Sequence, residues 1–443
     1  EESAEDYQAR IAAEEAEKQR IEAERVAKVR SVMTGVLDPY FNSSRSSSIL
    51  DNKSYMASKD IKADVSFWLK VNQSKRMSNM MNYYWYRGGS FRMLTGSMDN
   101  YFGDEMSAQM YFNKDEVLFN SDVSYNDEFA RYFKEIYASN LPKNYLEYIN
   151  QEDVLAVSSV SLISSKVWEH YPKMYAKMYN SMFNGDDKHN EEIEVMLDFI
   201  SVMLDEEALG DLVTGDAIFV LKDLAQVQVE YQSYEYNDDY SERTEVTKTK
   251  TETLPEFIAM FGTRNKPFMD KLLHLAVKQE VMYRGNEYYY TDGKNRDFPF
   301  KMGFTIQNNI AFVSTDIDEI KNIVANNVKS NFNPELSSEM ISNQGYVMLN
   351  IQNLLNRVPS DKLSISEQAL LDYSKKNTRS VKLLSNLKGD MLNTEIKLKA
   401  PEKSKNSALY IWDFINEAYK IDKEEQERRD KDREAREEEW FEN

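Results

Sequence analysis

Short apolar runs bounded by turn residues recur along the middle of the chain. Four of them begin at Asp64, Asp153, Gly215 and Gly345. Each run is short and partly alternating, which is typical of a half-buried β-strand, and a helical pattern follows it. The four copies predict two tandem halves of similar design.

Paired alternating runs predict hairpins between these strands. The pairs are Met106–Phe112 with Val117–Val123, Gly303–Gln307 with Ile310–Ser314, and Val381–Leu387 with Met391–Lys399. In the second pair, Asn308 and Asn309 form a two-residue turn in which both residues are expected at positive φ. Hairpins imply antiparallel pairing and disfavour a doubly wound parallel sheet.

Helical patterns fill the gaps between the strands. They cover residues 126–139, 164–183, 190–208, 254–261, 265–279, 316–329 and 364–377. Asp316 is expected to cap the sixth of these helices, and Glu319 three residues later gives the form of a capping box.

A further hairpin is predicted from Val227–Tyr236 and Arg243–Thr253. Its second arm is nearly all threonine and charged residues, so it can hardly be buried on either face and is expected to project. Lys248 and Lys250 would blunt its open edge. Two interpretations stay open, a solvated protrusion and an arm that contacts a partner.

Both ends of the chain have the composition of solvated helices. Residues 3–33 are rich in Ala, Glu, Lys and Arg, and Gly35 and Pro39 predict a stop before a serine-rich linker. Residues 407–440 begin with an apolar stretch that is expected to dock on the body and continue as a charged rod. Trp440 and Phe441 at its end are either part of a frayed tail or an aromatic anchor for a partner.

These patterns predict an α+β protein. It has two tandem halves of mainly antiparallel sheet with packed helices, flanked by long charged terminal helices. In chain order the expected parts are an N-terminal charged helix (1–35), a linker (36–62), a first half (63–208), a second half (209–405) with the projecting hairpin 227–253, and a C-terminal helix (406–443).

Composition narrows the possible functions. The chain has 443 residues, and its 41% hydrophobic residues suffice for real cores. A formal net charge of -20 repels phosphate backbones, so no nucleic-acid partner is expected. The absence of cysteine excludes disulfides, thiolate nucleophiles and zinc–thiolate sites. The histidines His170, His189 and His274 have no metal-binding spacing, and no apolar run approaches the roughly 18 residues of a membrane span.

Three strings in the body share a pattern with one known family. They are Asp64–Leu69 followed by Met77–Met81, Leu146–Ala156, and Gly210–Asp216 with Ala217–Leu224. The stretch 64–322 that contains them resembles a family of exported lipoproteins of Bacteroidetes that is defined only as a domain of unknown function. The resemblance implies a place in the cell envelope, with a lipidated cysteine just before Glu1 and an anchor in the outer membrane. The acidic residues that follow Glu1 favour the cell surface over the periplasmic face. The family carries no assigned activity.

Two aromatic clusters are candidate interaction sites. One consists of Tyr83, Tyr84, Trp85 and Tyr86, and the other of Tyr288, Tyr289 and Tyr290. Only every other ring of a strand is buried, so some of these rings face solvent or a partner. Packing within the fold, a protein interface and a glycan platform all remain open.

Chemistry-bearing motifs are scarce. The acidic stretch 184–192 offers oxygen ligands for Ca²⁺ but lacks the order of an EF-hand loop, so it is interpreted as a loop between helices. The chain has no phosphate-binding loop, no dinucleotide fingerprint and no nucleophile elbow. No catalytic residue, cofactor or metal is therefore expected.

The sequence thus predicts a non-catalytic cell-envelope lipoprotein, an accessory or scaffolding subunit of an outer-membrane protein complex. Its partners would be outer-membrane or envelope proteins, and it would touch the membrane only through an N-terminal lipid anchor. The alternative is a surface glycan-binding lipoprotein that uses the two tyrosine clusters as platforms. An enzyme of unknown class is the third hypothesis.

Overall fold

The computed structural model describes residues 4–42, 48–70, 102–137, 140–149, 154–183, 195–197, 199, 205–236, 243–293, 301–359 and 363–442. The chain divides into two compact units. One unit is the body, Asp60–Glu417, and the other combines Glu1–Lys59 with Ala418–Asn443. The predicted α+β class and the long terminal helices are confirmed.

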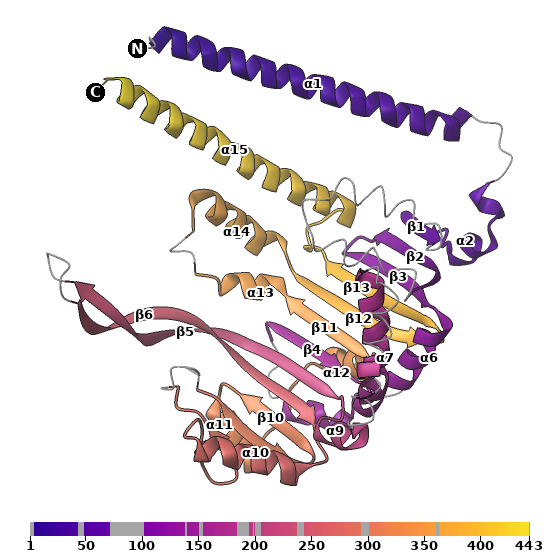
Figure 1. The fold of residues 1–443 in the computed structure, drawn as a ribbon, viewed down its shortest axis with the longest axis vertical. Helices are drawn as coiled ribbons and strands as arrows, with labels where there is room; N and C mark the ends of the chain where they lie inside the picture. The colour runs from indigo at the N-terminus through magenta and orange to yellow at the C-terminus, as the bar shows by residue number, and fades with distance from the viewer. Residues whose placement is uncertain are drawn as a thin grey trace. The chain divides into compact units, whose positions relative to one another are not determined.

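The body is built on a thirteen-stranded antiparallel sheet (Figure 1). Across the sheet the strands are β1 (Val65–Lys70), β2 (Phe102–Phe112), β3 (Glu116–Tyr125), β13 (Met391–Lys399), β12 (Ser380–Lys388), β11 (Gly345–Asn350), β4 (Ala156–Val160), β5 (Ala217–Tyr236), β6 (Arg243–Gly262), β10 (Ile310–Ser314), β9 (Gly303–Gln307), β8 (Tyr289–Tyr290) and β7 (Tyr283–Arg284).

The recurring apolar runs fold into a repeated arrangement of one strand, helices and a hairpin. β4 is followed by α7 (Ser164–Phe183), α9 (Glu206–Leu212) and the β5–β6 hairpin, and β11 by α13 (Ile351–Asn356), α14 (Ile365–Asn377) and the β12–β13 hairpin. In both, the first strand pairs with the first strand of its hairpin, as β1 does with β2. Because β11–β13 lie between β3 and β4, strands from residues 63–208 and 209–405 interleave in one sheet.

All of the predicted hairpins form. Asn308 and Asn309 have φ of 51° and 61°, as the two-residue turn requires. The helix predicted over residues 254–261 is wrong, because these residues belong to β6 and pair with β5 and β10. Pairing on both sides overrides the local pattern, and Pro255 is tolerated because β10 reaches only Ile258 and leaves the strand edge open there.

Three further helices lie within predicted ranges, namely α6 (Asp127–Ile136), α10 (Lys266–Lys278) and α11 (Ile317–Val324). The helices η3 (Lys143–Tyr148), α12 (Pro334–Ser342) and α13 have no counterpart in the sequence prediction. Part of the helix expected over residues 190–208 lies outside the described residues. The main core lies on one face of the sheet, where the side chains of Ile218, Met260, Phe312 and Tyr346 pack with Ile320 of α11 and Met340 of α12.

The terminal helices differ from the prediction at the C-terminal end of the first and in the first turns of the second. α1 (Ala4–Asn42) continues past Gly35 and Pro39. Pro39 has no N–H group to donate to the carbonyl of Gly35, and a glycine lets the helix bend at that point without ending. The predicted linker contains η1 (Ile49–Asp51) and α2 (Lys53–Ser58). In α15 (Ser407–Glu442) only part of the apolar stretch docks on the body. Tyr410 is buried near Phe414 and Tyr373, whereas Trp412 is 67% exposed.

Candidate functional site

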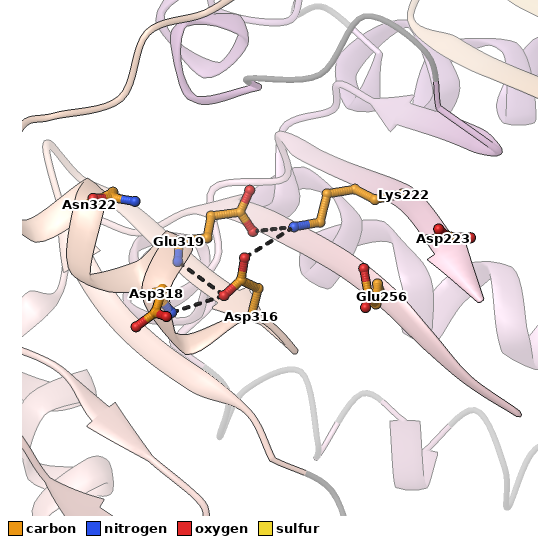
Figure 2. A pocket seen from close by; sticks show the side chains of 7 residues that line it. All are labelled: Lys222, Asp223, Glu256, Asp316, Asp318, Glu319 and Asn322. Atoms are coloured by element: carbon orange, nitrogen blue, oxygen red, sulfur yellow. Dashed lines mark hydrogen bonds and ion pairs between the residues drawn. The ribbon is translucent and has the colours of Figure 1, made fainter. Parts of the chain in front are cut away.

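A polar hollow of about 330 Å³ lies in the body at the root of the β5–β6 hairpin. Strands β5 and β6 and helix α11 supply the side chains that line it, as Figure 2 shows. They are Lys222, Asp223, Glu256, Asp316, Asp318, Glu319 and Asn322. Five of these seven residues are carboxylates and one is an ammonium, so the hollow attracts cationic groups.

An irregularity in the sheet places Lys222 in this hollow. The pairing of β5 with β6 shifts register between Leu221 and Asp223, so Lys222 has no direct partner across the ladder. Its side chain is 11% exposed, and its Nζ lies 3.0 Å from Oε2 of Glu319, whose side chain is 3% exposed. The Oγ of Ser314 lies 2.7 Å from the same carboxylate oxygen. Glu319 is therefore a buried carboxylate with one cation and one hydroxyl as partners, and Figure 2 shows its contact with Lys222.

The start of α11 holds the opposite wall of the hollow. Asp316 caps the helix as predicted, because its side chain accepts hydrogen bonds from the backbone N–H groups of Asp318 and Glu319. The expected capping box does not form, since the carboxylate of Glu319 turns to Lys222 instead. Sequence reasoning missed this pair. The available signal was a lysine placed directly after the apolar run that ends at Leu221.

The outer carboxylates of the hollow have weaker attachments. Asp223 accepts from Nε of Arg357 at 2.7 Å, and Asp318 from Nζ of Lys321 at 2.7 Å, on side chains that are largely exposed. Glu256 is exposed on β6. This arrangement can receive a lysine or arginine side chain of a partner without unpairing the buried Glu319.

A second pocket, of about 280 Å³, lies under α10 and contains one of the predicted tyrosines. Tyr289 is buried here beside His274, with Arg284 and Gln307 also in the lining. Arg284 Nη1 lies 3.1 Å from His274 Nε2, which must accept because a guanidinium only donates. His274 is therefore assigned the tautomer with its proton on Nδ1, which donates a hydrogen bond to the carbonyl oxygen of Asp270 at 2.6 Å.

The other two tyrosines of that cluster lie on the opposite face of β8, as strand alternation requires. Tyr290 stacks on Tyr283 with ring centroids 5.5 Å apart, and Tyr288 lies 5.9 Å from Tyr290. Tyr283 is 44% exposed, so this ring group reaches the surface. The interaction residues Tyr83, Tyr84, Trp85 and Tyr86 and the acidic stretch 184–192 lie outside the described residues. Trp440 and Phe441 belong to the last turns of α15, and their side chains are outside the described part as well.

One further group of side chains has metal-ligating atoms close together. The ligand atoms of Glu135, Glu169 and His170 lie within 4.8 Å of one another. His170 Nε2 is 2.8 Å from Glu135, and Lys166 lies 2.6 Å from Glu169 and holds the pKa of that carboxyl below its usual range. The ammonium of Lys166 already pairs with Glu169, and the contact of Glu135 with His170 joins α6 to α7.

Comparison of the chain with protein-family models, with curated proteins and with solved structures finds no match. The described part of the chain has no helix that combines the length and the apolar character of a membrane span.

Proposed function

We propose that this protein is a non-catalytic accessory or scaffolding subunit of an outer-membrane protein complex. The observation that supports this most strongly is the distal part of the β5–β6 hairpin, which we call the arm (residues 222–236 and 243–257). β4 pairs with β5 only as far as Leu221, and β10 pairs with β6 only from Ile258. The arm therefore leaves the sheet as a two-stranded ribbon (Figure 1).

Beyond its root, where Lys222 and Asp223 contact the body, the arm is ordered by contacts between its own two strands. Gln226 and Gln228 each donate a side-chain hydrogen bond to a threonine across the ladder, at 2.7 and 2.9 Å. The guanidinium of Arg243 lies 4.3 Å from the ring centroid of Tyr234. None of the described arm side chains is buried, and Tyr236 is 54% exposed. A two-stranded ribbon alone is marginally stable in water, so a partner along its edges or faces would stabilise it.

The hollow at the root of the arm gives such a partner a second contact. A partner that lies along the arm would bring its chain past Glu256 and Asp318, which favour a basic side chain. Exposed tyrosines next to a charged hollow are typical of protein interfaces that contain ordered water. The proposed location, lipid-anchored at the outer membrane and facing the cell surface, rests on the family resemblance, and so does the choice of outer-membrane or envelope proteins as partners.

The proposal can be tested by chemical crosslinking in native envelopes followed by purification under denaturing conditions. We expect the unchanged chain to crosslink to one defined membrane protein. Crosslinking should fall several-fold in a Tyr234→Ala, Tyr236→Ala variant and in a Glu256→Lys, Asp318→Lys variant. Tyr171→Ala removes an equally exposed ring from α7, away from the arm, and is the matched control. A chain that crosslinks to no protein, or an effect as large in the control, would refute the proposal.

Glycan binding is a second candidate, and the geometry around β8 favours it. The stacked Tyr283 and Tyr290 offer a ring surface, and the pocket on the other face of β8 presents polar groups of His274, Arg284 and Gln307. Within the pocket the ring of Tyr289 lies beside the imidazole of His274, and a ring next to planar polar groups suits the apolar faces and hydroxyl groups of a sugar. Saturation-transfer NMR with methyl glycosides of cell-surface sugars is the test. We expect a signal that Tyr289→Ala abolishes, and no signal with any glycoside would exclude this candidate.

A further inference from the structure

Helix α10 is packed in an unusual way for its sequence. Apart from Asp270, Lys271 and His274, residues 267–277 are apolar, yet the helix has no buried residue. Its half-buried apolar side chains, Met269, Leu273, Ala276 and Val277, recur at helical spacing and form one face. A helix with apolar side chains on more than this one face is normally covered on its other side too.

The outward side of α10 carries a stripe of large apolar side chains. Phe268, Leu272 and Leu275 are spaced at i, i+4 and i+7 and are 42%, 46% and 51% exposed. The segment that follows the helix exposes Val281 and Tyr283. We call Phe268, Leu272 and Leu275 the α10 stripe. Contiguous exposed apolar groups of this kind mark a surface that is covered in use.

The charge beside the stripe indicates what covers it. Lys271 follows Phe268 by three residues and Lys278 follows Leu275 by three, so both lie next to the stripe. Neither lysine has an ion-pair partner in the part of the chain that the structure describes, whereas Lys266 is paired with Asp270 at 3.0 Å. On a chain whose formal charge is -20, two free lysines on one helix face reverse the local sign.

We propose that the α10 stripe lies on an anionic lipid surface. Leucine and phenylalanine side chains would enter the boundary between headgroups and acyl chains, while the stems of Lys271 and Lys278 reach back to lipid phosphates. Tyr283, with an apolar ring and a polar hydroxyl, suits the same boundary. This contact goes beyond the proposed accessory function, because it would orient the body on a membrane independently of any lipid anchor.

The absence of cysteine allows a direct test. Leu275→Cys gives a single site for an environment-sensitive fluorophore, and Leu409→Cys places the same fluorophore on an equally exposed leucine of α15, 52% against 51% exposed. Vesicles of phosphatidylcholine, with or without a third of phosphatidylglycerol, are then added to each labelled full-length chain. We expect a blue shift at position 275 with the anionic vesicles and none at position 409. No shift at either position, or equal shifts at both, would overturn the proposal.

Vesicle flotation separates the apolar and ionic contributions. Leu272→Asp should lower the bound fraction by about tenfold or more on anionic vesicles, because it replaces an inserted side chain by a charge. Lys271→Glu with Lys278→Glu should lower it by a similar factor on anionic vesicles and leave the weak binding to neutral ones unchanged. All variants change exposed residues, so their thermal unfolding should match that of the unchanged chain. Unaltered flotation of both variants would overturn the proposal, as would a shift at position 275 caused by an envelope protein but not by lipid.

Discussion

Replacing Lys222 by methionine tests whether the hollow at the root of the arm holds a buried ion pair. Lys222→Met leaves the 3%-exposed carboxylate of Glu319 with only Ser314 as a polar partner. Removing one partner of a buried pair costs about 3–5 kcal/mol. Lys222 is still 11% exposed at the edge of the hollow, which admits some water, so we expect the lower end, about 3 kcal/mol of unfolding free energy.

Urea unfolding of four chains measures this coupling. They are the unchanged chain, Lys222→Met, Glu319→Met and the double variant. Because methionines of similar volume can replace a buried pair at little cost, the double variant should lie within about 1 kcal/mol of the unchanged chain. The exposed pair Arg264–Asp211, at 3.4 Å, is the control, and Arg264→Met should cost less than about 1 kcal/mol. If Lys222→Met costs no more than Arg264→Met, Glu319 is not held as a buried charge and the reasoning fails.

Three further substitutions test the body by the same unfolding assay. Gly215→Ala should cost more than about 1 kcal/mol, because Gly215 has φ of 101° and a Cβ there would overlap the backbone carbonyl of Leu162; a neutral result would contradict this geometry. Burial raises the pKa of the Asp216 carboxyl, because the folded body disfavours its ionised form. The folded body therefore loses stability as the pH rises from the pKa of Asp216 in the unfolded chain to its higher pKa in the folded one. Asp216→Asn, which can still accept from Ser161, should therefore stabilise the body at pH 7 but not at pH 3. Tyr346→Phe should cost about 1–2 kcal/mol, because it removes the 2.9 Å hydrogen bond from a buried hydroxyl to Glu339.

The hairpins could be predicted because their information is local. The turn between Gly303–Gln307 and Ile310–Ser314 needs two residues that tolerate positive φ, and an Asn-Asn pair supplies them. The arm could be foreseen in the same way, since alternating threonine and charge leaves neither face of the strand fit for a core. The placement of Tyr289 opposite Tyr288 and Tyr290 also follows from the two-residue period alone.

The features that the sequence did not predict depend on contacts between distant segments. The short apolar pattern of residues 254–261 fits a helix or a strand, and only the strands that pair with it decide the outcome. The neighbours in the sheet are equally non-local. β3 lies beside β13 in a register that sets Phe119 opposite Ile396, and any apolar strand of similar length would have offered the same pattern.

At the hollow, the local sequence and the contacts between distant segments together determine the position of Lys222. Up to Leu221 strand β5 has neighbours on both sides, and beyond Asp223 it has only β6, so the body ends and the arm begins at Lys222. The register shift there turns Lys222 out of the ladder and toward Glu319 of α11. A lysine at this point has its charge compensated within the body by the carboxylate of Glu319. The acidic hollow thus lies at the point where the arm leaves the sheet. A partner bound along the arm would therefore also contact the hollow.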